Sequence, residues 1–331
     1  MMSRMIPLRI TPGQTSNKQE SVTLATDRKR KGRDISGILL LDKPQGMSSN
    51  ACLQQAKRLF QASKAGHTGA LDPLATGVLP LCFGEATKVS QFLLEADKRY
   101  LTTIKLGERT NTADAEGEVI STRPVGELSE QALVTCLSRF NGDIEQVPPM
   151  YSALKHKGQP LYKLARAGQE VERKSRQVTI HDLILHEFDG ASLTLEIHCS
   201  KGTYVRTIAD DLGEALGCGA HVTALRRLQA GVFRLQNCVT PEVLQTIFDA
   251  EGTDGLDALL QAPDLAIAHL PKAEMSAQMA AYVRQGQAVM LRQLPASGLV
   301  RLYDEAEFIG IGEMLDDGRV KPHRLIKETA R

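Results

Sequence analysis

The sequence lacks long apolar runs, paired cysteines and a strong net charge. No stretch approaches the roughly 18 consecutive apolar residues of a membrane span, and the first residues contain no signal-peptide core. Six cysteines lie at 52, 82, 136, 199, 218 and 238 without a C-x-x-C pair, so a zinc site or a disulfide framework is not expected. A cytoplasmic protein with reduced thiols is the prediction.

The net charge of +1 does not by itself indicate a nucleic-acid partner. Two segments are nevertheless locally rich in Lys and Arg. Residues 1–33 are polar and end in a basic run, which predicts a disordered basic arm that either contacts RNA or is a passive tail. Residues 151–176 hold seven Lys or Arg against two Glu, interleaved with Tyr and Leu. Such a segment either binds phosphates or is a solvated basic surface.

With 331 residues, the chain is long enough for two domains. We expect residues 34–255 to form an α+β domain with irregularly mixed helices and strands. The apolar run 38–41 predicts a buried strand, and Ser48 or Ser49 is expected to begin a helix. Further strands are predicted at 100–106 and 193–198, and helices at 129–140 and 207–216. Three short strands between 299 and 326 indicate a small β domain over 265–331.

The segment 66–80, GHTGALDPLATGVLP, has the strongest indication of chemistry. Its glycines allow unusual backbone conformations or a close approach to a ligand, and Pro73 restricts Asp72 to an extended conformation. Asp72 beside His67 is therefore either a group that acts on a ligand or a turn aspartate that caps its own backbone. A P-loop is excluded, because no Gly-Lys-Ser/Thr follows the glycines. No dinucleotide fingerprint is present either.

The same segment resembles the catalytic motif of the TruB family of bacterial tRNA pseudouridine synthases. Four more segments resemble family motifs and occur in the same order: LDKPQGMSSN at 41–50, DKRY at 97–100, HCSKGTYVRTI at 198–208 and LRRL at 225–228. The similarity extends from about residue 33 to 233 and more weakly to the end. A stretch at 109–114, RTNTAD, departs from the family pattern, since Asn111 stands where an aspartate is usual.

The resemblance implies a catalytic domain with a long mixed, mostly antiparallel sheet and a C-terminal PUA-like RNA-binding domain. It implies an isomerase that makes pseudouridine at position 55 in the T-loop of tRNA, as a monomer, without metal, cofactor or membrane. A carboxylate suits this reaction because it can attack carbon or accept a proton. Attack at C1′, attack at the base and proton abstraction at C2′ all remain open.

The resemblance also implies roles for individual residues. Asp72 is expected to be the essential carboxylate, and Arg206 the guanidinium that keeps it ionised. A base taken out of the RNA loop would stack on Tyr100 and be enclosed by Tyr204 and Leu225, while His67 meets the flipped nucleotide. Lys43, Pro44 and Asp114 are expected to support the site.

Residues 151–176 correspond to an RNA-clasping insertion in the family. Its expected phosphate contacts are Lys155, Lys157, Lys163, Arg173, Lys174 and Arg176. Two alternatives stay open: a guide-RNA-dependent pseudouridine synthase, and a tRNA-folding chaperone that acts without chemistry.

Overall fold

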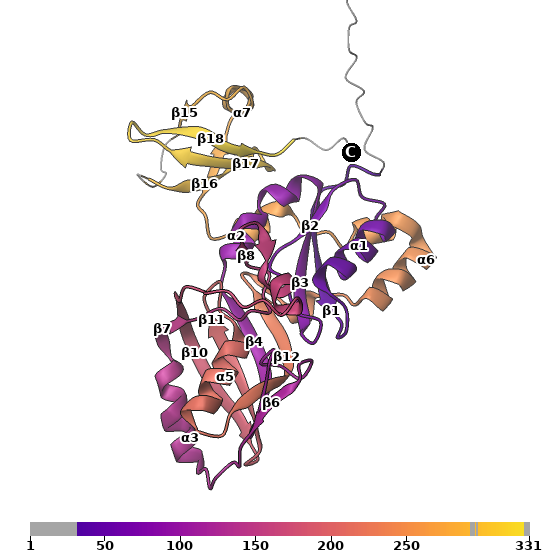
Figure 1. Cartoon of the computed structure of the whole chain (residues 1–331). Helices are drawn as coiled ribbons and strands as arrows, with labels where there is room; N and C mark the ends of the chain where they lie inside the picture. Colours follow the sequence, from indigo (N-terminus) through magenta and orange to yellow (C-terminus); the bar gives the residue numbers. More distant parts are fainter. Residues whose placement is uncertain (1–31, 292–294, 296, 328–331) are drawn as a thin grey trace, which may run out of the picture. The chain divides into compact units, whose positions relative to one another are not determined.

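The computed structural model describes residues 32–291, 295 and 297–327. Its larger sheet is built in the order β1-β3-β12-β4-β11-β10-β7 (Figure 1). All neighbours on this path are antiparallel except β3 and β12, which are parallel. The strands are β1 (Gly37–Lys43), β3 (Thr76–Phe83), β4 (Lys98–Leu106), β7 (Gly142–Gln146), β10 (Arg176–Phe188), β11 (Ser192–Cys199) and β12 (Ala220–Ala230). The predicted mixed, mostly antiparallel sheet is confirmed.

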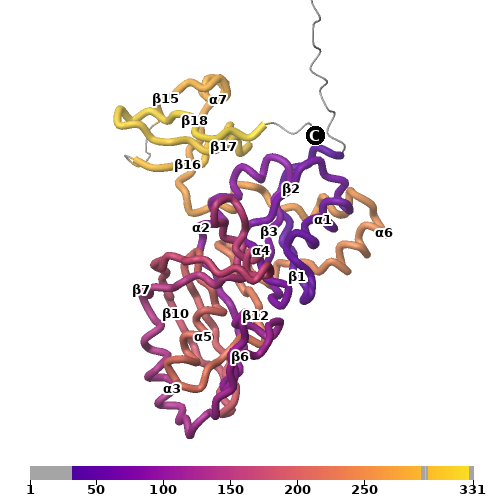
Figure 2. Tube along the Cα trace, viewed as in Figure 1, coloured from indigo at the N-terminus to yellow at the C-terminus, as the bar shows by residue number. Residues whose placement is uncertain are grey.

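Two short strands join this sheet from the side: β2 (Ala65–His67) pairs with β3, and β13 (Phe233–Arg234) pairs with β12. The strand β12, whose orange trace in Figure 2 marks it as late in the chain, is hydrogen-bonded between the early strands β3 and β4. This insertion of a late strand brings residues about 150 positions apart into contact, such as Thr76 and Arg226. The centre of the sheet is therefore where distant sequence motifs meet.

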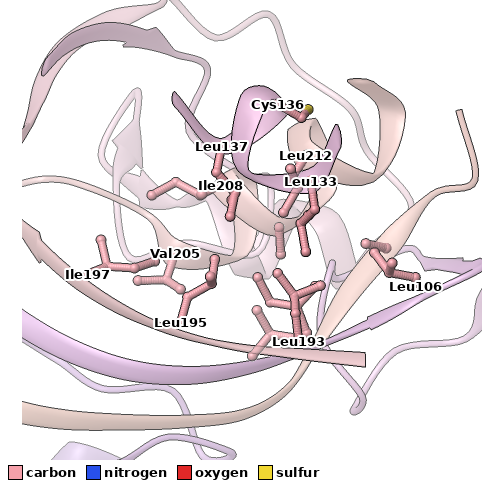
Figure 3. Packing of buried hydrophobic residues seen from close by; sticks show 14 of the residues in the cluster. Leu106, Leu133, Cys136, Leu137, Leu193, Leu195, Ile197, Val205, Ile208 and Leu212 are labelled. Carbon is pink, nitrogen blue, oxygen red and sulfur yellow. The ribbon is translucent and has the colours of Figure 1, made fainter. Parts of the chain in front are cut away.

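Helices cover the sheet in two groups. α3 (Glu130–Leu137) and α5 (Val205–Ala215) pack on β4, β11 and β10, where Leu133, Ile208 and Leu212 bury their side chains against Leu193 and Leu195 (Figure 3). This spacing of apolar residues on α5 is the pattern of a helix with one buried face. Ser129 begins α3 by accepting a hydrogen bond from Ala132 N, and Gly217, at φ +82°, follows the end of α5.

α1 (Ser49–Leu59) and α6 (Pro241–Asp257) cover one face of β1 and β3. The other face packs against α2 (Ser90–Glu95) and the 3-10 helix Pro263–Ile267. Burial on both faces explains the continuous apolar run of β1. Ser48 is the N-cap of α1, so the hydroxyl of Ser49 is not used in capping this helix.

The C-terminal part forms a separate five-stranded sheet, in the order β14-β16-β17-β18-β15. Its strands are β14 (Lys272–Met275), β15 (Val289–Met290), β16 (Leu299–Asp304), β17 (Glu307–Met314) and β18 (Arg319–Leu325), and α7 (Ala277–Arg284) packs against them. The predicted small β domain is confirmed. No helix among the described residues is long and apolar enough to cross a membrane.

Two small hairpins stand apart from these sheets. One, formed by β5 (Glu108–Thr110) and β6 (Val119–Thr122), follows β4. The other lies within residues 151–176, where the strands β8 (Lys155–His156) and β9 (Gln159–Pro160) pair before α4 (Leu161–Arg166).

Two predicted boundaries are wrong. Arg33 belongs to the ordered structure, because its backbone N donates to Gln61 O over 2.6 Å and its guanidinium pairs with Asp257. The rest of the predicted arm, residues 1–31, lies outside the described residues. The boundary at 255 falls inside α6, and Gln261 still exchanges backbone hydrogen bonds with Ile38. The elements around the large sheet therefore continue at least to residue 261.

Gly77 is required by a close approach of two strands. It has φ +101°, and a Cβ there would lie 2.2 Å from the backbone oxygen of Arg227. We predict that Gly77→Ala lowers the free energy of unfolding by about 1–3 kcal/mol or more, measured by urea unfolding. Gly66→Ala is the control, since a Cβ at Gly66 meets nothing within 4 Å. Equal stability of the two variants would contradict this account.

Candidate active site

A cavity of about 280 Å³ lies at the centre of the large sheet. Its walls come from the loop before β3, the start of β4, the turn before α5 and the middle of β12. Asp72, Tyr100, Tyr204, Arg206 and Leu225, all predicted as site residues, line it together. His67 does not line this cavity.

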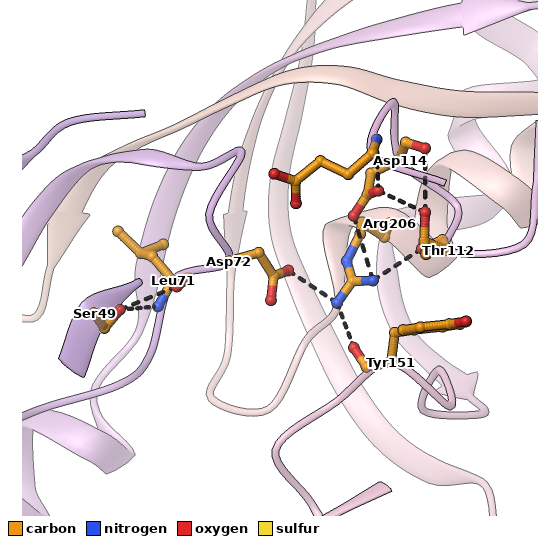
Figure 4. A network of polar contacts seen from close by, with 8 residues as sticks. Ser49, Leu71, Asp72, Thr112, Asp114, Tyr151 and Arg206 are labelled. Carbon is orange, nitrogen blue, oxygen red and sulfur yellow. Dashed lines mark hydrogen bonds and ion pairs between the residues drawn. The ribbon is translucent and has the colours of Figure 1, made fainter. Parts of the chain in front are cut away.

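Arg206 sits in the first turn of α5 and is buried, with 5% of its side chain exposed. Its Nη2 lies 2.9 Å from Asp72 Oδ2 and donates to Tyr151 O over 2.7 Å, and its Nη1 donates to Thr112 O over 2.9 Å (Figure 4). The guanidinium, which comes from α5, thus binds the carboxylate of Asp72, which comes from the loop before β3.

Asp114 lies on the far side of Arg206, with its Oδ2 3.5 Å from Nη1. Its Oδ1 accepts hydrogen bonds from the Thr112 hydroxyl and from Glu116 N. Because one guanidinium faces two carboxylates, the orientation of Arg206 is set from both sides. Asn111 instead accepts from Glu118 N within the β5–β6 hairpin, away from Arg206.

The Asp72 carboxylate opens into the cavity, with 44% of its side chain accessible. It is nevertheless surrounded by protein, and this loss of solvation raises its pKa above the usual range, while the Arg206 guanidinium lowers it again. Asp114 adds a smaller upward effect on the pKa of Asp72. Arg206 is therefore the group that does most to lower the pKa of this poorly solvated carboxylate.

The loop that carries Asp72 is tied down at several points. Ser49 Oγ accepts from Leu71 N over 2.7 Å and donates to Leu71 O over 3.0 Å, which joins α1 to the loop. Lys43 Nζ donates to Pro44 O and Pro73 O, and Gly46 N donates to Pro73 O. These contacts place Lys43 and Pro44 beneath the residue that follows Asp72.

The aromatic walls have different supports. Tyr100 extends from β4, and burial raises the pKa of its phenol. Tyr204 precedes α5, and its backbone exchanges two hydrogen bonds with the buried side chain of Gln146. The guanidinium of Arg176 lies over the Tyr204 ring, 5.9 Å from its centroid. Both rings therefore have a defined position before any ligand binds.

His67 lies in β2, and its Nδ1 is buried with no hydrogen-bond partner among the described residues. Burial, followed by the positive charge of Arg227, lowers its pKa. A neutral imidazole results at neutral pH.

The basic residues of the insertion separate into two groups. Lys155, Arg173, Lys174 and Arg176 line a second cavity of about 530 Å³, while Lys157 and Lys163 do not. The four lysines are exposed, but Arg173 and Arg176 are half-buried. Arg173 donates to Pro148 O and pairs with Glu170, so part of its binding capacity is used internally.

Two buried cations of the cavity, Arg227 and Lys98, were not predicted from the sequence. A signal was available for Arg227: it lies two residues after Leu225 on the same strand, and residues two apart on a strand point to the same face. Among the described residues, no group of three or more His, Cys, Asp or Glu side chains is arranged to hold a metal ion.

Comparison with protein families gives three consecutive matches. A model described as TruB family pseudouridylate synthase (N terminal domain) matches residues 57–205. A tRNA pseudouridylate synthase B C-terminal domain matches 206–268, and a pseudouridine synthase II TruB C-terminal model matches 271–326.

Curated relatives match nearly the whole chain. The tRNA pseudouridine synthase B of Aeromonas salmonicida is 56% identical over 308 residues, which cover 91% of this chain and 96% of that protein. The protein of the same name from Tolumonas auensis is 55% identical, covering 91% and 95%.

Solved structures resemble this fold as well. An H/ACA ribonucleoprotein bound to a substrate RNA containing 2′-deoxyuridine matches with a TM-score of 0.68 and 23% identity, covering 88% of this chain and 85% of that one. A Cbf5–Nop10–Gar1 complex matches with a TM-score of 0.67 and 26% identity, covering 88% and 84%. The fold and the matches define the class, a pseudouridine synthase. Within that class, the chain belongs to the TruB family.

The decrease in rate on the acid side of the pH–rate profile should reflect the pKa of Asp72, which Arg206 lowers. If Asp72 acts as the charged carboxylate, activity should fall as the pH drops through its raised pKa. Arg206→Gln removes the charge that lowers this pKa, and we predict that the acid limb moves up by about 1–3 pH units. Single-turnover rates from pH 4.5 to 8.5 measure it. An acid limb at the wild-type pH would show that Arg206 does not control the charge of Asp72.

Proposed function

We propose that this chain converts uridine to pseudouridine at position 55 in the T-loop of tRNA, with Asp72 as the essential carboxylate. The observation that carries the proposal is the Asp72–Arg206 pair in a cavity walled by Tyr100 and Tyr204. It occurs in a chain 53–56% identical to curated tRNA pseudouridine synthases over at least 90% of its length. Because its proposed substrate is tRNA, we expect the protein to be cytoplasmic.

The geometry suits one extruded nucleotide. A uridine in a folded RNA loop must leave the stack before its sugar can reach a carboxylate. In this cavity the base would stack on Tyr100, with Tyr204 and Leu225 as the other apolar walls. The ribose would then face Asp72, whose pKa Arg206 lowers. We expect His67, two residues before the cavity-lining Gly69, to meet the nucleotide or the opened loop.

The chemistry of Asp72 has three routes that this arrangement supports equally. The carboxylate can displace the base at C1′, add to the base, or take the proton from C2′. In each route the base must be detached, turned and rejoined through C5. The positioning role of Lys43, Pro44 and Asp114 is common to all three.

The relatives favour direct action on tRNA over the two alternatives. The guide-RNA complexes match at 23–26% identity, whereas the tRNA enzymes match at 53–56%. A chaperone without chemistry has no need for a poorly solvated carboxylate in a cavity. Such a carboxylate is costly to maintain, as the raised pKa of Asp72 shows.

Asp72→Asn separates chemistry from RNA binding. Incubation of the wild type with unmodified tRNA should give one pseudouridine, at position 55, mapped by chemical modification and reverse transcription. The variant keeps the shape of the side chain but has no carboxylate, so we predict a rate loss of at least about 10²–10⁴-fold with tRNA affinity retained. Pseudouridine formation by the variant at a rate close to that of the wild type, or modification at another position, would overturn the proposal.

The exposed lysines of the insertion provide a test of phosphate binding. Replacing Lys155, Lys157, Lys163 and Lys174 by Gln should reduce the slope of log Kd against log salt by about 0.7–0.9 for each lysine that binds a phosphate. Fluorescence titration of labelled tRNA between about 50 and 300 mM KCl, a range over which salt screening becomes stronger, measures the slope. Lys105→Gln, at the far end of β4, is the control. An unchanged slope in the variant with all four lysines replaced would contradict phosphate binding by the insertion.

A further inference from the structure

Arg227 is a buried cation that forms no ion pair with a carboxylate of the described residues. It is the largest fully buried side chain among the described residues, with 1% exposed. Its Nε donates to Val78 O over 2.7 Å and its Nη2 to Gly69 O over 3.2 Å. Both acceptors are neutral carbonyls, and within the described part of the chain Arg227 forms no ion pair. A buried charge usually has an opposite charge beside it, so Arg227 requires an explanation.

The position of Arg227 connects it to the reaction. It lines the same cavity as Asp72 and lies directly across from Tyr100 in the β12–β4 register. Lys98, on the same wall, donates to Leu94 O and Ala96 O. Burial, with Arg227 as a further cause, lowers the pKa of Lys98 to about 8. The wall that holds Tyr100 is therefore positive, whereas the charge of Asp72 is already matched by Arg206.

The reaction produces a negative charge on the base. When the C1′–N1 bond breaks, its electron pair stays on N1 and is shared with O2 and O4. This holds whether an Asp72 oxygen forms a new bond to C1′ or takes the proton from C2′. Addition of the carboxylate to the base likewise moves an electron pair onto O4. The base loses this charge when C5 uses an electron pair to bond to C1′, while the Asp72 oxygen leaves C1′ as a carboxylate or C2′ regains its proton. C5 then gives up its proton and N1 gains one, which leaves neutral pseudouridine.

We propose that Arg227 stabilises the negative charge on the detached uracil while Tyr100 holds the ring. A fixed cation in a water-poor pocket is effective because it needs no reorganisation when the charge appears. Its hydrogen bonds to Val78 and Gly69 keep it in place, and the nearby glycines Gly69 and Gly77 leave room for it. The inference rests on the proposed function and adds a second charged group, acting on the base rather than on the carboxylate.

The test compares two substrates: T-arm RNA with uridine or with 5-fluorouridine at the target position. Fluorine withdraws electrons and stabilises the detached base by itself. We expect Arg227→Gln to slow the single-turnover conversion of the target nucleotide by about 10²–10³-fold with uridine. With 5-fluorouridine the effect should be at least about tenfold smaller. The Kd for RNA and the midpoint of thermal unfolding are measured for each variant.

Arg206→Gln is the matched control, since it removes a guanidinium that acts on Asp72 instead of the base. Its rate should fall by the same factor with both substrates. Equal rate reductions for Arg227→Gln with the two substrates, or no reduction, would overturn the role of Arg227. A wild-type enzyme that forms no pseudouridine would instead overturn the proposed function.

A second variant keeps the test usable if Arg227→Gln does not fold. Arg227→Lys retains a positive charge, but burial and the neighbouring Lys98 would make that lysine titrate at a lower pH. Its rate with uridine should therefore fall with rising pH more than the wild-type rate does, and less so with 5-fluorouridine. A pH profile that matches the wild type on both substrates would overturn the inference.

Discussion

A single guanidinium, that of Arg206, joins three segments that are far apart in the chain. It pairs with Asp72 from the loop before β3, with Asp114 after the β5 strand, and with the carbonyl of Tyr151 at the start of the insertion. Removal of one partner would leave a buried charge without its match, which is costly. Because Arg206 begins α5, whose Ile208 and Leu212 pack into the core, the pair rests on a rigid element.

The charged side chains of the cavity form two groups. On one side, Asp72 and Arg206 compensate each other, and the carboxylate would face the bound nucleotide. On the other side, Arg227 and Lys98 leave a positive wall behind Tyr100, where the base would lie. The hydrogen bond from Arg206 to Tyr151 also connects the basic insertion to the catalytic pair. RNA that binds the insertion would thus be close to the group that keeps Asp72 charged.

The sequence predicted the elements better than their arrangement. Ser129, Gly217 and the apolar run of β1 are local signals, and local signals place helices and strands. The position of β12 between β3 and β4 depends on pairing between residues about 150 positions apart, for which no local signal exists. The prediction for Arg33 failed for the same reason: it looks like part of a basic tail, but its partner Asp257 is distant in sequence. Asp72 was found through resemblance to the family motif. The burial of Arg227 without an ion pair among the described residues could not be predicted from composition, which favours an exposed arginine.

The most direct measurement is a crystal structure of the Asp72→Asn variant with T-arm RNA that carries an unmodified uridine at position 55. We predict the uracil on Tyr100 and beside Arg227, with C1′, C2′ or a ring carbon of the base about 3–3.5 Å from the side-chain oxygen of residue 72. Arg206 should still bridge residue 72, Asp114 and Tyr151. A target base that stays stacked in the RNA loop, or a nucleotide held away from residue 72, would contradict this account.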